Sequence, residues 1–218
     1  MDSSRRDKPR TRRWERTRQA ILRTAEVVFA ELGFGAATLE EIARRLELRR
    51  AALAYYFADK EALYDAVFAE ILREVRKRLM AAPAQAGPLA RMESIASNWV
   101  DFLCERPEAG RVLLRQMVDS LPPRSPRTRA IFRQLVAEVQ ETLADGERLG
   151  RFKPIDAGQY GVMIAGTSLL WVSARDVLER ALGFDPLAPE HIEALRHRLV
   201  QLTRQLLEVV PEDGSSAT

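Results

Sequence analysis

The chain has 218 residues, 46% of them hydrophobic and 30% charged, which excludes an intrinsically disordered protein and allows a sizeable core. Its single cysteine, Cys104, excludes an internal disulfide framework and favours a reducing cytoplasm. Residues 1–60 hold 14 Lys and Arg against 9 Asp and Glu, a net charge of +5, while the remainder holds 20 against 22. The basic end indicates a polyanionic partner, either nucleic acid or a membrane surface; a solvated charged face is the alternative.

The N-terminal part is predicted to be a basic arm followed by a long helix. Residues 1–11 lack an apolar segment, so they are expected to be disordered and not a secretory signal. The arm fits three roles equally: insertion into a minor groove, contact with phosphates, or a solvated tail. The first helix is predicted from about Arg12 to Leu32, where apolar residues form one buried stripe, and Gly33 is expected to end it.

The next segment is predicted to form two short helices and the start of a long one. Thr38 is expected to cap the second helix, with Glu41 completing a capping box. A break at Glu47–Leu48 separates it from a third helix over Arg49–Tyr56, and Asp59 caps the fourth. Two short helices braced by a longer one predict a helix-turn-helix.

The third helix has an unusual composition, because small alanines stand among arginines and tyrosines. Leu53 and Phe57 are predicted to face inward, which turns the alanines outward. Small outward side chains allow a helix to enter the major groove of DNA. The alternative, that the alanines merely favour a helix, does not explain why the arginines and tyrosines cluster there.

Residues 18–67 resemble the DNA-binding domain of the TetR/AcrR family of transcriptional regulators. The shared pattern is Leu-Gly-Phe after the first helix, Thr before "LEEIA", then Leu-x-x-x-Phe and "DKEAL". The chain departs from the family at three positions: Glu47 replaces a glycine in the turn, Arg49 replaces a Ser or Thr cap, and Ala54 replaces a tyrosine.

The resemblance implies a set of DNA-contacting residues. Thr38, Tyr56 and Lys60 would contact phosphates, while Arg50 would reach guanine and the outward alanines would meet thymine methyl groups. The predicted set is Thr38, Arg49, Arg50, Ala51, Ala52, Ala54, Tyr55, Tyr56 and Lys60. Residues 12–60 are therefore the predicted DNA-binding domain.

Residues 61–210 are predicted to be a helical body, followed by a disordered tail at 211–218. Bulky residues in it stand at core spacing, and the family resemblance implies an enclosed apolar ligand pocket; plain core is the alternative. The predicted pocket residues are Met92, Ile95, Trp99, Phe102, Met117, Phe132, Met163 and Trp171. Polar groups that fit a ligand-orienting role, or equally solvation or ion pairing, are Asn98, Arg115, Gln116, Asp119 and Arg175.

The last two helices are predicted to pair with their copies. Residues 157–174 carry no charge, but their polar residues and glycines favour close helix contact over a membrane span. The final helix has a coiled-coil-like apolar seam. The resemblance implies a homodimer interface at Gly161, Ala165, Ile192, Leu195, Leu199, Leu202 and Leu206.

No catalytic or metal constellation is visible: His191 and His197 lie on different helix faces, and Cys104 has no nearby histidine. We therefore expect an all-α, cytoplasmic, homodimeric regulator without enzyme activity, cofactor or membrane partner. It would be a repressor released from a palindromic operator by a small apolar ligand, with the fourth helix as the lever between the two domains. Two alternatives stay open: a DNA-binding protein without an inducer, acting structurally or through a protein partner, and a peripheral membrane protein using the basic arm.

Overall fold

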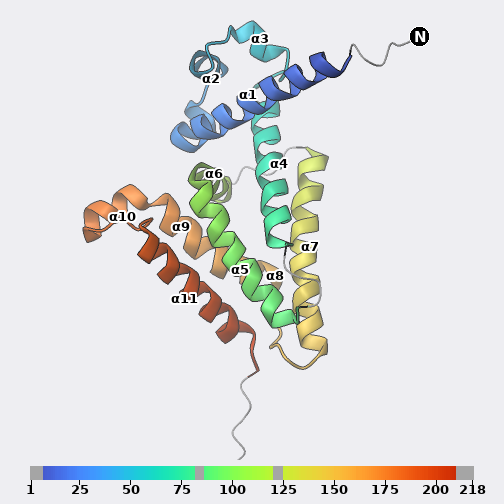
Figure 1. The fold of residues 1–218 in the computed structure, drawn as a ribbon, viewed down its shortest axis with the longest axis vertical. Helices are drawn as coiled ribbons and strands as arrows, with labels where there is room; N and C mark the ends of the chain where they lie inside the picture. The colour runs from blue at the N-terminus through green and yellow to red at the C-terminus, as the bar shows by residue number, and fades with distance from the viewer. Residues whose placement is uncertain (1–6, 82–85, 120–124, 210–218) are drawn as a thin grey trace, which may run out of the picture. The chain divides into compact units, whose positions relative to one another are not determined.

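The computed structural model describes residues 7–81, 86–119 and 125–209, and the regular elements in these ranges are helices (Figure 1). The predicted all-α class is therefore confirmed. The predicted disordered tail at 211–218 lies outside the described residues. The elements are α1 (Asp7–Ala36), α2 (Leu39–Arg45), α3 (Arg50–Ala54), α4 (Lys60–Leu79), α5 (Pro88–Glu105), α6 (Pro107–Val118), α7 (Pro126–Arg148), α8 (Ala157–Gly161), the π-helical turn η1 (Val162–Gly166), α9 (Thr167–Ser173), α10 (Arg175–Leu182) and α11 (Pro189–Leu207).

The chain forms two compact units, which divide it differently from the predicted boundary after residue 60. Unit 1 comprises residues 1–73 and 108–131, and unit 2 comprises residues 74–107 and 132–218. Unit 1 thus adds most of α4, nearly all of α6 and the start of α7 to the helix-turn-helix. The difference arises because α6 is held in unit 1 by side chains that contact residues far from it in the sequence.

The core of unit 1 is formed around α1, against which α2 packs, and α3 packs in turn on α2. Ile21, Ala25 and Phe29 are buried, which confirms most of the predicted apolar stripe. Leu32, the last member of that stripe, is instead exposed next to the break in the helix. Phe29 also meets the ring of Tyr64 edge-on at 4.9 Å between centroids, so the stripe reaches α4.

Both ends of α1 differ from the prediction. The helix begins at Asp7, so the last residues of the expected disordered arm are helical. Gly33 interrupts α1 but does not terminate it: its φ of 75° and ψ of 170° are non-helical, and helix resumes to Ala36. A side chain at residue 33 would be strained at this positive φ, and its Cβ would lie only 2.9 Å from Nη1 of Arg115.

In unit 2, α11 packs along α5, and α9 also contacts α5. The core includes Met92, Trp99 and Phe102 of α5. The indole Nε1–H of Trp99 donates to Ser168 Oγ at 2.7 Å, and this hydroxyl donates to the backbone carbonyl of Ile164 at 2.7 Å. The buried indole N–H of Trp99 and the hydroxyl of Ser168 are therefore satisfied by contacts that join α5, η1 and α9.

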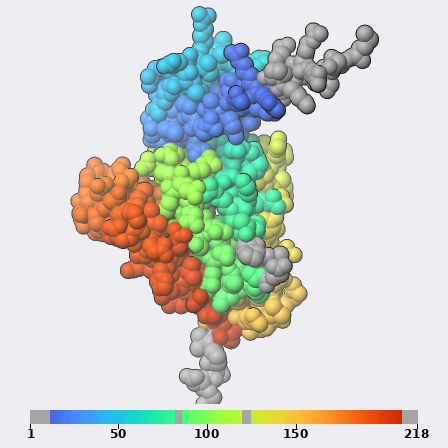
Figure 2. All heavy atoms as spheres, in the orientation of Figure 1, coloured from blue at the N-terminus to red at the C-terminus, as the bar shows by residue number. Residues whose placement is uncertain are grey.

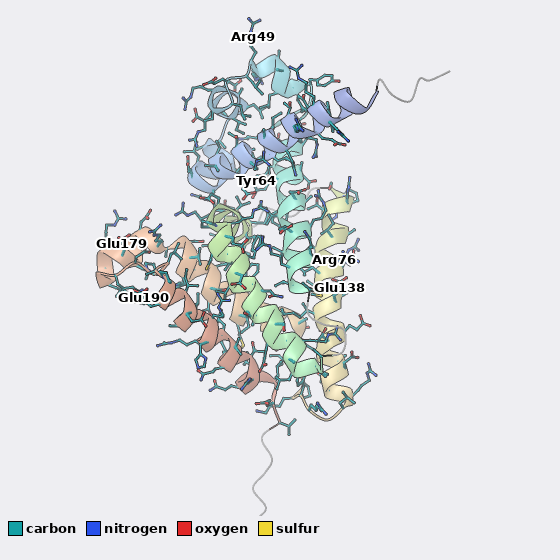
Figure 3. The ribbon with its side chains drawn as sticks, viewed as in Figure 1. Arg49, Tyr64, Arg76, Glu138, Glu179 and Glu190 are labelled. Atoms are coloured by element: carbon teal, nitrogen blue, oxygen red, sulfur yellow. The ribbon has the colours of Figure 1, made fainter. Side chains whose placement is uncertain are left out.

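Further polar contacts hold the ends of the unit 2 helices. Arg76 of α4 and Glu138 of α7 point toward each other (Figure 3), and Arg76 Nη2 donates to Glu138 Oε1 at 2.6 Å. Phe152 and Glu208 form an isolated antiparallel β-bridge after α7 and α11. A Cβ at Gly146 would collide with the Phe152 ring, so only glycine lets this ring lie against α7.

The outer part of unit 2 is less closely packed. α10 has no buried residue and lies at the edge of this unit (Figure 2). In the described part of the chain, no single helix is long and apolar enough to cross a membrane; Ala157–Ser173 and Arg175–Leu182 pass that test only as a pair, which is bent by 71°.

Candidate nucleic-acid interface

Thr38 caps α2 as predicted, because its Oγ1 accepts a hydrogen bond from the backbone N–H of Glu41 at 3.1 Å. The Glu41 carboxylate does not complete the capping box but is bound by Arg44 and Arg45 at 2.7–2.8 Å. Arg45 also reaches Glu31 of α1 at 2.7 Å. The hydrogen bonds from Arg44 and Arg45 lower the pKa of Glu41 to about 2, so the carboxylate stays ionised and holds Arg45, which links α2 to α1 through Glu31.

The turn between α2 and α3 is made by Glu47, whose φ of 54° is the one positive φ of a non-glycine residue among the described residues. The backbone N–H of Leu48 donates to the carbonyl of Ala43 at 2.9 Å and completes the turn. This is the position at which the family pattern has glycine. The turn is therefore left-handed without glycine, and the Cβ of Glu47 makes this backbone conformation less favourable than it would be for glycine.

α3 presents the outward face that the sequence predicts. Leu53 and Phe57 are buried, whereas Ala51, Ala52 and Ala54 are exposed. Tyr55 is 76% exposed. The buried pair fixes the rotation of α3, and the small exposed residues leave its outer surface free for close approach to a partner.

The two arginines at the start of α3 have different surroundings. Arg49 is the N-cap residue, makes no side-chain cap hydrogen bond, and points outward from unit 1 (Figure 3). Arg50 forms an ion pair with Glu40 of α2, with 2.6 Å between Nε and Oε1. Both partners of this pair remain largely exposed. Glu40 could not be singled out from the sequence, because an exposed acid in the first turn of a helix has an ordinary role there.

An aromatic cluster that was not predicted from the sequence joins the first part of α1 to the end of α3. The Trp14 and Tyr56 rings stack with 5.7 Å between centroids, and Tyr55 meets Tyr56 edge-on at 5.3 Å. The guanidinium of Arg18 lies 5.3 Å from the Phe57 ring centroid. These contacts hold Tyr56, a predicted phosphate contact, in place from two sides.

Lys60 is the predicted DNA contact whose surroundings differ most from expectation. Its ammonium group donates to the backbone carbonyls of Phe34 at 2.8 Å, Ala37 at 3.0 Å and Gly35 at 3.3 Å. It also lies 4.5 Å from the centroid of the Phe34 ring. Because an ammonium group has three N–H donors, these contacts occupy all of them. Lys60 therefore fastens the start of α4 to the α1–α2 connection, and its contact with phosphate stays a prediction.

Contacts from α6 explain why this helix belongs to unit 1. The Arg115 guanidinium donates to the carbonyls of Ala30 and Glu31, each at 3.2 Å. The Tyr64 hydroxyl donates to Gln116 Oε1 at 2.9 Å. Burial, followed by the charge of Asp119, raises the pKa of Tyr64 to about 12, so the hydroxyl keeps its proton. Arg115 and Gln116, predicted as possible ligand-orienting groups, thus have partners on α1 and α4.

Two of the other polar groups predicted to orient a ligand, Asn98 and Arg175, have partners in unit 2, whereas Asp119 lies in unit 1. Asn98 donates to the carbonyl of Arg78 at 3.0 Å. Arg175 forms two hydrogen bonds with the carboxylate of Asp185, at 3.0 and 2.5 Å. These contacts fit the ion-pairing alternative that the sequence left open.

The structure does not bring all the predicted pocket residues together. Met92, Ile95, Trp99 and Phe102 are buried side by side on α5, and the Trp99 and Phe102 rings stack at 5.7 Å. Trp171 is half-buried, and its Nε1–H donates to the carbonyl of Pro186 at 3.0 Å. The remaining residues are exposed on three other elements: Met117 on α6, Phe132 on α7 and Met163 on η1.

The predicted dimer residues also separate into two groups. Leu195 and Leu199 are 8% and 2% exposed, because α11 packs along α5 and turns them into the core of unit 2. The structure therefore corrects their place from a surface seam to the protomer's own core. Five residues are half-buried: Gly161, Ala165, Ile192, Leu202 and Leu206. Exposed apolar residues that the prediction did not include are Val162, Leu170, Val177 and Leu182.

Together, the capped α2, the left-handed turn and the outward-facing α3 define a helix-turn-helix DNA-binding protein. The chain belongs to the TetR family: the model for bacterial regulatory proteins of the tetR family matches residues 21–67, and the model for the tetracyclin repressor-like C-terminal domain matches residues 88–202. It is therefore a DNA-binding transcriptional regulator and not an enzyme.

Relatives and solved structures agree with this assignment. The HTH-type transcriptional regulator RutR of Escherichia coli K12 is 29% identical over 147 residues, which cover 67% of this chain and 69% of RutR. The HTH-type transcriptional repressor NicS of Pseudomonas putida is 29% identical over 185 residues, which cover 81% and 85% of the two chains. A TetR family transcription regulator from Marinobacter aquaeolei shares the fold with a TM-score of 0.72 at 20% identity, over 91% of this chain and all of that one.

Proposed function

We propose that the protein is a cytoplasmic homodimeric repressor that reads a palindromic operator with α3. The observation that carries this proposal is the orientation of α3: Leu53 is fully buried, so Arg49, Ala51, Ala52 and Tyr55 form an exposed face on the basic end of the chain. Such a face fits a major groove, where an arginine can bind guanine and alanines can contact thymine methyl groups. The similarity to the repressor NicS supports repression as the direction of control.

Dimerisation would involve an exposed strip on η1 and α9, consisting of Val162, Met163 and Leu170. These residues recur at helical spacing on one side of their helices, and all are exposed in the protomer. Contiguous apolar residues on a surface are typical of sites of protein association. A two-fold dimer would present two copies of α3 and would require a palindromic site.

An apolar effector would bind in unit 2 at the α5 residues Met92, Ile95, Trp99 and Phe102. The Trp99 and Phe102 side chains offer a large apolar surface. The one polar group of these two side chains, the Nε1–H of Trp99, already donates to Ser168 Oγ. Release from DNA requires that the effector bind one conformation of the dimer more tightly than the other.

Selection from a randomised duplex pool at physiological salt tests the DNA-reading proposal. The wild type is expected to enrich a palindrome, and Tyr55→Ala is expected to lose it. Phe132→Ala, which removes an exposed aromatic side chain from unit 2, is the matched control and should enrich the same palindrome. Binding that depends on salt but not on sequence would contradict the proposal and indicate an electrostatic patch.

Molar mass measured by light scattering tests the dimer surface. Leu170→Arg should give a monomer, because it places a charge inside the strip, whereas Leu149→Arg should leave the dimer intact. Leu149 is similarly exposed, at 62% against 60%, but lies in the turn after α7. A dimer that survives Leu170→Arg unchanged would exclude this strip as the interface.

A second candidate function is DNA binding without a small-molecule inducer. The close packing of the α5 residues favours it, since Met92 and Phe102 are fully buried within the protomer. A panel of small apolar compounds added to the operator complex separates the two. Release by a compound that no longer acts on Ile95→Trp would support the effector; if no compound releases the DNA, the second candidate is preferred.

A further inference from the structure

The Arg50–Glu40 ion pair connects the start of α3 to the first turn of α2. The distance between Arg50 Nε and Glu40 Oε1 is 2.6 Å, and the two side chains are 66% and 62% exposed. Since ion pairs this exposed contribute little to stability, the pair does little to hold the fold together. Glu40 nevertheless lies next to Arg50, the first residue of α3.

A carboxylate beside this arginine changes which DNA groups the arginine can bind. A guanidinium carries five N–H donors, and one carboxylate can engage at most one edge of it, so donors remain for the O6 and N7 acceptors of guanine. Phosphate oxygens are negatively charged and are repelled by the same carboxylate. The pair is also neutral overall, which weakens its attraction to the phosphate backbone.

We propose that Glu40 is a specificity-determining residue that positions Arg50 for a guanine edge and disfavours its contact with phosphates. This inference rests on the proposed function, in which α3 reads a major groove. Glu40 would lower the affinity for unrelated DNA and keep the preference for one base pair in each half-site. The neighbouring acid Glu41 cannot do the same, because Arg44 and Arg45 already occupy its carboxylate.

Duplex selection and binding isotherms with three variants test this inference. In Glu40→Gln, the affinity for a scrambled duplex is expected to rise about 3- to 10-fold at low salt. The plot of the logarithm of the binding constant against the logarithm of the salt concentration should become steeper by about 1. Its preference for guanine at one half-site position should fall about 3- to 10-fold. This corresponds to part of the base discrimination that one bidentate arginine–guanine contact provides. Glu40→Asp should restore part of that preference. Glu47→Gln removes a charge from the turn between the same helices and should leave the preference unchanged.

A double-mutant cycle identifies the route by which Glu40 acts. Arg50→Gln should abolish the guanine preference, and adding Glu40→Gln to it should change nothing further at that base pair. An effect of Glu40→Gln that persists without Arg50 would overturn the proposal and indicate direct recognition of cytosine by Glu40. Unchanged selectivity in Glu40→Gln would overturn it too. If the wild type enriches no palindrome, the proposed function itself fails, which is a different result from an intact palindrome with unaltered selectivity in the variant.

Discussion

The two units of the protein are stabilised in different ways. In unit 1, charged and polar side chains bind backbone carbonyls or each other at helix ends, as Lys60 and Arg115 do at the end of α1. In unit 2, α11 packs along α5 through buried apolar residues such as Leu199, and two ion pairs also join these helices, Arg196 with Asp101 and Arg204 with Glu93. Polar contacts have definite directions, so they suit a domain that must hold α3 in one orientation. The apolar packing of unit 2 is less directional, which would suit the dimer partner and the effector that we propose for this unit.

The largest expected effect is the loss of a core aromatic ring, which should be similar in both units. Phe29→Ala in unit 1 and Phe102→Ala in unit 2 each remove a side chain that is at most 1% exposed, so each should destabilise its unit by about 3–5 kcal/mol. Urea denaturation followed by circular dichroism measures this. A loss below about 1 kcal/mol in either variant would show that the core there can collapse around the cavity.

Lys60→Met should break a contact that is specific to unit 1. The substitution keeps the aliphatic stem but leaves the carbonyls of Phe34, Gly35 and Ala37 without their donor, at a cost of about 2 kcal/mol. Thermal unfolding measures the loss. Lys77→Met, at an exposed site near the end of the same helix, is the control and should have little effect. If phosphate binding were instead the main role of Lys60, stability would be unchanged and only DNA affinity would fall.

Glu47→Gly should strengthen unit 1 slightly. Glycine adopts the φ of 54° without a steric penalty, although it also increases the entropy of the unfolded chain, so the net gain is about 0.5–1 kcal/mol. The midpoint of urea denaturation should rise for Glu47→Gly and not for Glu47→Ala, which retains the Cβ. A gain with alanine would mean that the charge of Glu47, not its backbone conformation, limits stability.

The smallest expected effect is on the stability of the protein at low pH. The pKa of Glu41 falls from 4.5 to about 2 on folding, so its stabilisation is present above pH 4.5 and is lost as the pH falls toward 2. Glu41→Gln should therefore be less stable than the wild type at pH 7, with a difference that shrinks across this interval. Unfolding curves at a series of pH values measure it, and a constant difference down to pH 2 would contradict the assignment.

Features that depend on short spacing could be predicted from the sequence. The caps at Thr38 and Asp59 could be predicted because each side chain accepts a hydrogen bond from a backbone N–H three residues away. The inward direction of Leu53 and Phe57 follows from helical periodicity. The resemblance to a known family added the role of α3, which composition alone suggests without establishing.

Features that depend on distant contacts could not be predicted. The sequence gives no sign that Lys60 binds carbonyls more than 20 residues away, or that Arg115 binds those of α1. The apolar seam of α11 has the same residue spacing whether it faces another protomer or α5. The spacing therefore could not decide whether Leu199 lies in a dimer interface or in the core of the protomer. Trp14 was overlooked because its partner Tyr56 lies on another helix.

The stack of Trp14 on Tyr56 also gives the protein a built-in optical probe. The chain has three tryptophans, and Trp14 alone belongs to unit 1, while Trp99 and Trp171 belong to unit 2. Trp14 is 39% exposed and Trp99 only 6%, so their fluorescence emission should differ in wavelength. Replacing Trp99 and Trp171 with phenylalanine would leave emission from the α1–α3 junction alone. A change in that emission on adding DNA would report, without any attached dye, whether this junction moves when the protein binds.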